Sequence, residues 1–325
     1  MTIDQYIVTQ GRGPHLGDKD YGGNILFCWI QKVGCTNFKK LFKPLSIHIR
    51  AAVPNGNEWT PNKIVNSIMH NTSWHKAVFY REPLERFLSG YLDKCIKEYP
   101  HGMYCQRVFG KKDATFDEAV RVLITQNPDA LDGHFHSQID FCGGLRNTIS
   151  HFDTVEMLQP QTSREKVEEM LRLANITSPN FDQQFPGLDR PKDKHQMQSS
   201  KKLESYYNNT QHVGIVVNFF YEDYILFGIP LPEFALHALL ELNRTKDEFM
   251  LSSEKLDRLL KITKDDSGGK DIQMQTEMES GDIHPDISNQ EYYSHAVIIL
   301  YAIIVGYVCS QVWMRWKKKA DTKKL

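Results

Sequence analysis

The sequence predicts an α/β domain of three layers with a central parallel sheet, followed by a C-terminal transmembrane helix. Two units in which a short apolar strand leads through a loop into a helix predict the domain, because alternating strands and helices build parallel sheets covered on both faces. An uncharged run of 19 residues, Ala296 to Met314, predicts the membrane helix. The net charge of -1 gives no global attraction to nucleic acid, so we expect no nucleic-acid partner.

The first strand-loop-helix unit begins with Asn24-Ile-Leu-Phe-Cys-Trp29, a continuous apolar run typical of a buried parallel strand. Phe38 to Leu45 then predicts a helix closed by Pro44. The loop between them, Lys32-Val-Gly-Cys-Thr-Asn37, lacks the Gly-Lys-Ser/Thr order of a Walker A loop. Its backbone N–H groups at a helix N-terminus predict an anion site with Lys32 as an added cation, and an ordinary turn with a solvated lysine is the alternative.

The second unit begins with the predicted strand Lys76-Ala-Val-Phe-Tyr-Arg81. Pro83 suits the first turn of a helix, and apolar residues recur at helical spacing from there through Lys97. Arg81 ends its strand at the edge where open α/β sheets bind ligands, and the hydroxyl of Ser89 on the following helix could reach the same anion. A solvated helix face is the alternative.

Later segments complete the predicted domain. Helices are expected at Phe116 to Thr125 and Arg164 to Asn175, a strand at Val213 to Phe219, and one or two amphipathic helices between Phe234 and Ile262. The predicted organisation is an N-terminal tail (1–20), the α/β domain (21–233), a helical extension (234–263), a flexible polar stem (264–290), the transmembrane helix (291–314) and a basic cytosolic tail (315–325).

Six cysteines show no paired spacing typical of a zinc site, so we expect no metal. Cys309 lies in the apolar run, and Cys28 and Cys35 flank the junction of the first strand and its loop. The other three cysteines are disulfide candidates if the domain is lumenal, with free buried thiols as the alternative: Cys95, Cys105 and Cys142.

The basic residues after the apolar run predict that the C-terminus lies in the cytosol and the domain in the lumen. Four Asn-x-Ser/Thr sequences favour the same orientation: Asn71, Asn175, Asn208 and Asn243. Residues 1–20 contain no apolar export segment, so two alternatives stay open: the true N-terminus is missing, or the protein inserts by its tail and keeps the domain in the cytosol.

Together the two loops resemble the elements with which the Golgi carbohydrate sulfotransferases, including the chondroitin 4-O-sulfotransferases, bind 3′-phosphoadenosine-5′-phosphosulfate (PAPS). The family's Pro-Lys-Val-Gly-Cys-Thr-Asn-Trp loop is matched from Lys32 to Asn37, with Gln31 for Pro and Phe38 for Trp. Its second element, Arg-Asp-Pro followed by Arg, Ser, Tyr and Lys, is matched at Arg81, Pro83, Arg86, Ser89, Tyr91 and Lys94. The resemblance implies a P-loop-like sulfotransferase domain that binds PAPS through Lys32, Val33, Gly34, Cys35, Thr36, Asn37, Arg81, Arg86 and Ser89.

Three further segments extend the resemblance over Tyr21 to Pro232: His134-Phe135-x-x-Gln138, Phe152-Asp-Thr-Val-Glu156 and Tyr221-Glu-Asp-Tyr-Ile-Leu-Phe-Gly228. It implies sulfonate transfer from PAPS to a carbohydrate hydroxyl at a Golgi membrane, without a metal. Lys32 is expected to stabilise the leaving phosphate oxygen, and His134, or else His136, to act as the general base. Ser137 departs from the family's Pro.

Two other functions remain possible from the sequence. A nucleotide-dependent phosphotransferase would bind ATP with Mg²⁺. A non-catalytic, membrane-tethered protein that binds nucleotide or glycan would keep the loops and lack turnover. The sequence identifies neither the acceptor sugar nor the oligomeric state.

Overall fold

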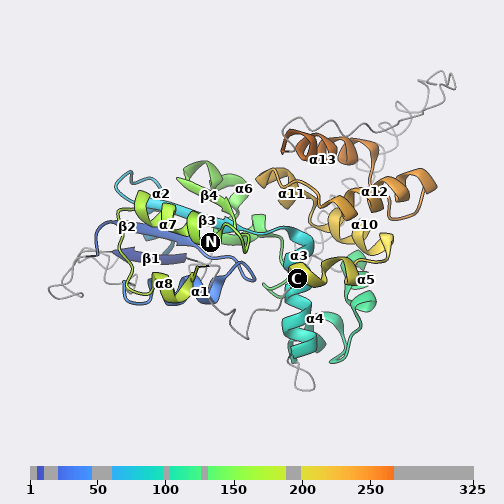
Figure 1. Ribbon diagram of the computed structural model, residues 1–325, viewed down its shortest axis with the longest axis horizontal. Coiled ribbons are helices and arrows are strands. Elements are labelled where there is room, and N and C mark those ends of the chain that lie inside the picture. Colours follow the sequence, from blue (N-terminus) through green and yellow to red (C-terminus); the bar gives the residue numbers. More distant parts are fainter. Residues whose placement is uncertain are drawn as a thin grey trace, which may run out of the picture. The chain divides into compact units, whose positions relative to one another are not determined.

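A four-stranded sheet with the order β1-β2-β3-β4 carries the α/β half of the domain (Figure 1). The structure, a computed structural model, describes residues 6–10, 21–45, 61–97, 103–125, 131–187 and 199–266. The three strands β2 (Asn24–Cys28), β3 (His75–Tyr80) and β4 (Thr154–Met157) are parallel, and β1 (Tyr6–Gln10) pairs antiparallel with β2. The carboxyl ends of the three parallel strands therefore meet at one edge, as the two strand-loop-helix units predicted.

Strand β1 corrects the prediction that residues 1–20 form only a tail and that the sheet is purely parallel. Tyr6 and Val8 are buried, and Tyr6 lies opposite Cys28 in the register of the two strands. The Tyr6 hydroxyl donates a hydrogen bond to the carbonyl of Cys142. The strand forms because its alternating apolar side chains add to the core while its backbone pairs with the open edge of β2.

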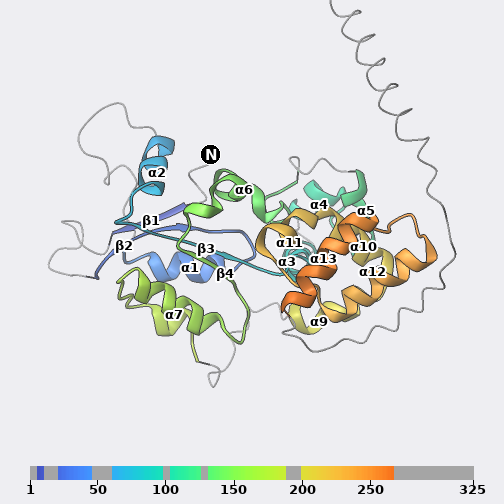
Figure 2. The ribbon, with the colours of Figure 1, turned by 90° about the horizontal axis from the view of Figure 1, so that it is seen from above.

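Helices cover both faces of the sheet, which gives the three predicted layers. Figure 2 shows α1 (Cys35–Phe42) and α7 (Ser163–Leu173) on one face and α2 (Pro61–Met69) and α6 (Leu145–Thr148) on the other. The short helix α8 (Phe181–Gln184) packs beside α1. Aromatic rings fill the layer between β2, β3, α1 and α8, with ring contacts among Phe27, Phe38, Phe42, Phe79 and Phe185.

The other half of the domain is helical (Figure 2). It contains α3 (Pro83–Tyr91) with its π-helical continuation Leu92–Lys97, α4 (Met103–Phe109), α5 (Phe116–Thr125), α9 (Ser199–Tyr206), α10 (Thr210–Phe219), α11 (Tyr221–Phe227), α12 (Glu233–Thr245) and α13 (Ser253–Asp266). The helices predicted around α3, α5, α7, α12 and α13 are confirmed.

The segment Val213 to Phe219, predicted as a strand, lies in helix α10 and is a wrong prediction. Helix α10 packs against α3, α5 and α12, so most of its residues are buried, and an apolar run buried on several sides has the same pattern in a strand and in a helix. A side chain at Gly214 would come within 2.6 Å of Leu242 and 2.7 Å of the Phe249 carbonyl oxygen. Close contact with neighbouring elements therefore decides the conformation of this segment.

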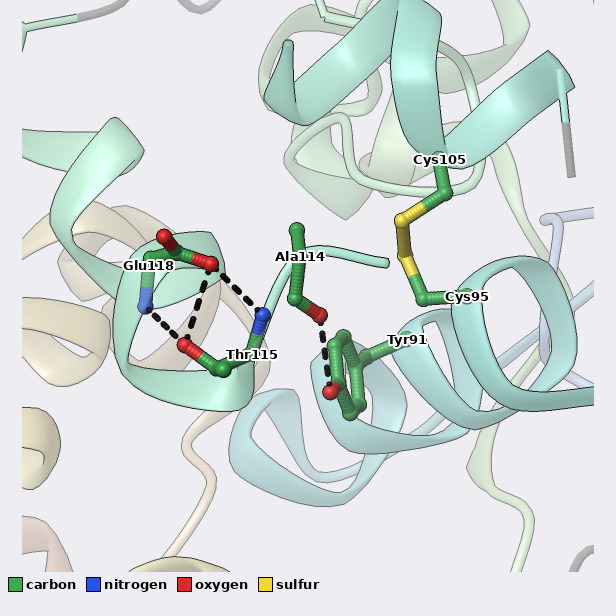
Figure 3. Close-up of a disulfide and its surroundings, with 6 residues drawn as sticks. All are labelled: Tyr91, Cys95, Cys105, Ala114, Thr115 and Glu118. Carbon is green, nitrogen blue, oxygen red and sulfur yellow. Dashed lines mark hydrogen bonds between the residues drawn. A yellow bond between two sulfur atoms is a disulfide. The ribbon is translucent and has the colours of Figure 1, made fainter. Parts of the chain in front are cut away.

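Two disulfides join segments of the domain, Cys28–Cys142 and Cys95–Cys105. The second links the π-helical turn after α3 to α4 (Figure 3). Cys95, Cys105 and Cys142 were the expected candidates, whereas the pairing of Cys28 was missed. Cys28 ends β2, and only the folded chain brings residue 142 beside it across a sequence separation of 114.

Within the described residues, no helix combines the length and the apolar character that crossing a membrane requires. The predicted span Ala296–Met314 and the basic tail lie outside the described residues. Of the predicted stem, only residues 264–266 are described, and they end helix α13.

Glu82 begins helix α3 as its N-cap. Its carboxylate accepts hydrogen bonds from the N–H groups of Leu84, at 3.1 Å, and Glu85, at 2.6 Å, and from the Tyr224 hydroxyl, at 2.5 Å. Burial raises the pKa of Glu82 to about 7, against the opposing effect of these three donors. The start of the helix that carries Arg86 therefore depends on a carboxyl group that titrates near neutral pH.

Replacing this carboxyl group should change how stability depends on pH. An unfolded glutamate titrates near 4.5, so between pH 4.5 and 7 the folded domain binds more protons, and the free energy of unfolding falls as pH rises. We expect Glu82→Gln, which cannot ionise, to reduce the loss of stability between pH 5 and pH 8 by about 2 kcal/mol in urea unfolding. Glu204→Gln, at an exposed position of α9, should behave like the wild type. Equal slopes in all three proteins would contradict the prediction.

Candidate active site

The loop after β2 has the backbone geometry of an anion site. Gly34 is the N-cap of α1 with φ of 62°, and Lys32 also has a positive φ of 67°. No side chain caps α1, and its first turn contains no acidic residue. The leading N–H groups of a helix have no partner within that helix and attract anions. A side chain at residue 34 would come within 2.9 Å of Leu158, so glycine keeps the loop close to the end of β4.

The ammonium group of Lys32 is held in place by an ion pair. Its Nζ lies 3.2 Å from Oδ2 of Asp93, in the π-helical turn after α3. Burial lowers the pKa of Lys32, and Asp93 opposes this effect. The pKa of Asp93 is lowered because Lys32 and Lys94 outweigh its own burial. Asp93 was not predicted, and no pattern in the sequence distinguished it from a solvated residue of the helix.

Arg81 joins the two predicted nucleotide elements. Its guanidinium Nη1 donates to the carbonyl of Lys32 at 3.1 Å. Its Nη2 donates to Oε1 of Glu85 at 2.6 Å and to the hydroxyl of Ser199 at 2.8 Å. Burial alone would raise the pKa of Glu85, but Arg81 outweighs this and lowers it. Arg81 therefore lies at the carboxyl edge of the sheet next to the anion loop, as predicted, while Glu85 and Ser199 are partners that the sequence did not reveal.

Arg86 is buried and bonded to the backbone. Only 1% of the residue is exposed. Its Nε donates to the Gln31 carbonyl at 2.9 Å, and its two terminal nitrogens donate to the carbonyls of His136, at 2.6 Å, and Gly133, at 3.3 Å. Burial lowers its pKa to about 10. These hydrogen bonds join the loop after β2 to residues 133–136 through Arg86, and the predicted contact of Arg86 with the nucleotide stays a prediction. Ser89 is buried on the same helix.

His134 is oriented by a carboxylate. Its Nδ1 hydrogen bonds to Oδ1 of Asp132, which also accepts from the His134 backbone N–H at 3.1 Å. Oδ2 of Asp132 accepts from Arg107 at 2.5 Å. Burial disfavours the charged form of Asp132, but His134 and Arg107 outweigh it and hold the pKa far below its usual range. Since a carboxylate accepts, Nδ1 carries the proton and Nε2 is the basic nitrogen. The spacing Asp-x-His was the available signal for Asp132.

His136, the second predicted base, is engaged in backbone contacts. Its Nε2 hydrogen bonds to the carbonyl of Leu131, so this nitrogen carries the proton. Its own carbonyl accepts from Arg86. His136 thus bonds to a backbone carbonyl where His134 bonds to a carboxylate.

A buried network anchors the residues that follow the histidines. Oε1 of Gln138 accepts from the Arg81 backbone N–H, and Nε2 of Gln138 donates to the Arg81 carbonyl, both at 2.9 Å. The Asp223 carboxylate accepts from the Ser137 hydroxyl at 2.5 Å and from the N–H groups of Gln138, at 3.0 Å, and Ile139, at 3.1 Å. Ser137 has φ of -56°, the value that proline adopts, so the departure from the family's Pro preserves the local backbone.

A cavity of about 290 Å³ lies beside the Asp132–His134 pair. It is lined by Arg107, Val108, Leu131, Asp132 and Gly133. Among the described residues, no group of three or more His, Cys, Asp or Glu side chains could hold a metal ion. The cavity therefore adjoins the segment that Arg86 joins to the loop after β2.

Comparison with known proteins identifies the family. Residues 18–230 match the model of the sulfotransferase family. Carbohydrate sulfotransferase 14 of Homo sapiens is 29% identical over 153 residues, which cover 40% of this chain and 39% of that protein. Carbohydrate sulfotransferase 11 of Rattus norvegicus is 25% identical over 212 residues, 54% of this chain and 57% of that protein. The chain spans about half the length, or less, of these curated relatives, and no solved structure matches. With well over half of its residues matched by the family model, the chain belongs to the sulfotransferase family.

Proposed function

We propose that this protein transfers the sulfonate group of PAPS to a hydroxyl of a carbohydrate. The observation that carries the proposal is the junction of two elements at one sheet edge, where Arg81 bonds to the Lys32 carbonyl of the anion loop. The matched relatives are named carbohydrate sulfotransferases, which supports a sugar acceptor.

The residues of the loop fit an anionic donor. Helix α1 begins without a capping side chain or an acidic residue, so its first N–H groups suit the 5′-phosphosulfate. Arg81 is placed to bind the 3′-phosphate by exchanging Glu85 or Ser199 for a phosphate oxygen. Arg86 supports the loop by donating a hydrogen bond to the carbonyl of Gln31.

The transfer breaks the bond between sulfur and the bridging phosphate oxygen and forms a bond between sulfur and the acceptor oxygen. Lys32 stabilises the negative charge that develops on the leaving oxygen. His134 takes the proton of the acceptor hydroxyl on Nε2, and Asp132 stabilises the resulting imidazolium. This division of roles uses only cations and a base that the domain itself supplies.

The location is part of the same proposal: a Golgi membrane protein with one span at Ala296–Met314 and a lumenal domain. Two disulfides suit an oxidising compartment. The Asn of each acceptor sequence is exposed, at Asn71, Asn175, Asn208 and Asn243, as glycosylation requires.

Replacing Lys32 should mainly lower turnover, whereas replacing Arg81 should mainly weaken nucleotide binding. We expect Lys32→Ala to lower kcat about 100-fold, the loss typical of one group that stabilises developing charge, while leaving much of the affinity for 3′-phosphoadenosine-5′-phosphate. Arg81→Ala should weaken that affinity at least about tenfold, since it removes a charged donor. Calorimetric titration and transfer of labelled sulfonate from PAPS to desulfated chondroitin measure the two effects.

Two controls accompany this experiment. Lys40→Ala removes an exposed cation from the same helix α1 and should leave binding and turnover unchanged. Titration of the wild type with ATP and Mg²⁺ tests the phosphotransferase alternative. Preference for ATP, or no binding of the 3′-phosphorylated nucleotide by the folded protein, would exclude PAPS as donor.

Loss of the Asp132–His134 pair should lower turnover. We expect His134→Ala to cost about 100-fold or more in kcat, because the acceptor hydroxyl loses the group that takes its proton. Asp132→Asn should also reduce kcat, because it removes the carboxylate that orients the imidazole. His136→Ala serves as the comparison and should retain most of kcat. Unchanged kcat in both the Asp132 and the His134 variants, measured by transfer of labelled sulfonate, would assign the base to another residue.

A further inference from the structure

The Cys95–Cys105 disulfide joins helix α4 to the π-helical turn that follows α3 (Figure 3). The helix has only seven residues, too few for a stable isolated helix, so it depends on tertiary contacts. Both cysteines are buried. Their chain neighbours are Lys94 in the π-helical turn and Tyr104 on α4, so the disulfide fixes the positions of these two residues relative to each other.

Tyr104 contacts three charged or titratable side chains of the site. The Lys94 Nζ lies 4.5 Å from the centre of the Tyr104 ring, and the Arg107 guanidinium lies 4.9 Å from it. The His134 ring packs edge to face at a centroid distance of 5.9 Å. Cations over an aromatic face and edge-to-face rings are both attractive arrangements. The tyrosine ring is therefore a shared contact surface for all three groups.

Each cation belongs to a chain of ion pairs that ends at a proposed catalytic group. Lys94 contacts Asp93 at 3.3 Å, and Asp93 pairs with Lys32 at 3.2 Å. Arg107 pairs with Asp132, the carboxylate that orients His134. Through these contacts Tyr104 connects the ion pair of Lys32, which is proposed to stabilise the leaving oxygen, with His134, which is proposed to take the proton of the acceptor hydroxyl.

Burial does not account for a tyrosine at this position. The residue is 39% exposed, and its neighbour Met103 is 75% exposed. The apolar anchors of α4 are other residues, Val108 and Phe109. The role of the Tyr104 ring therefore lies in its contacts with Lys94, Arg107 and His134.

We propose that Tyr104, fixed by the Cys95–Cys105 disulfide, is a positioning residue that holds His134 and the Asp93–Lys32 pair in their productive places. The inference rests on the proposed sulfonate transfer. It assigns to the disulfide a role in placing the groups that act in the transfer step, while the affinity for the nucleotide is retained.

Three substitutions on α4 test the ring. Tyr104→Leu keeps an apolar side chain and removes the aromatic face, and we expect kcat to fall about 10- to 100-fold, the loss typical of a catalytic group displaced by about 1 Å. Tyr104→Phe retains the face and should restore kcat to within about twofold. Met103→Ala, the matched control next to it, should leave kcat unchanged. In all three, affinity for 3′-phosphoadenosine-5′-phosphate should stay within about twofold of the wild type.

The double variant Cys95→Ala/Cys105→Ala tests the disulfide. These cysteines are buried, so substitution is preferable to a reductant, which would also act on Cys28–Cys142. Once circular dichroism shows that the variant is folded, we expect the same loss of kcat as in Tyr104→Leu with nucleotide affinity retained. Unchanged kcat in both variants, or a parallel loss of nucleotide affinity, would overturn the proposal.

A readout that needs no turnover separates this inference from the proposed function. The ¹⁵N signals of the His134 ring should change in Tyr104→Leu and in the double cysteine variant, and stay as in the wild type in Met103→Ala. If the wild type binds the nucleotide and transfers no sulfonate, the proposed function fails. In that case the ¹⁵N signals of the His134 ring still test whether Tyr104 positions His134. Identical signals in the wild type and in every variant would overturn that positioning role.

Discussion

The buried guanidinium of Arg86 is the interaction on which the arrangement of the site depends. It donates to the carbonyls of Gln31, Gly133 and His136, which belong to segments about 100 residues apart in sequence. A buried charge without partners is strongly unfavourable, and these three carbonyls are the partners of the guanidinium. Replacing Arg86 by a residue without donors would leave the three carbonyls without this donor. The anion loop and the histidine segment therefore keep a common position because one side chain of α3 satisfies both.

A second buried charge fixes the other side of the same segment. Asp223, on α11, accepts from Ser137, Gln138 and Ile139, and burial raises its pKa against the effect of these donors. Gln138 in turn pairs with both backbone groups of Arg81 at the end of β3. The sheet, the histidine segment and the helical half are thereby joined by hydrogen bonds whose loss would leave polar groups buried without partners.

The charges nearest the proposed chemistry are arranged in pairs. Lys32 lies against Asp93, and His134 lies against Asp132, which also pairs with Arg107. Each carboxylate restrains its partner in a defined direction before any ligand binds, which is the preorganisation that electrostatic catalysis requires. Tyr104 contacts His134 and Arg107 directly and is connected to the Lys32–Asp93 pair through Lys94, which is why we propose a positioning role for α4 and its disulfide.

The sequence by itself determined the two strand-loop-helix units, the place of the loop Lys32 to Asn37 before a helix and the place of Arg81 at the end of its strand. These features follow from local order along the chain and from the edge at which parallel strands end. Only the tertiary structure decided that Val213 to Phe219 is helical, that residues 6–10 complete the sheet and that Cys28 pairs with Cys142. It also showed that Arg86 is buried and bonded to the backbone of two distant segments, and it brought Asp93 and Asp132 beside Lys32 and His134. The physical reason is common to these cases: burial, pairing and hydrogen-bond partners come from segments distant in sequence, and local patterns carry no information about them.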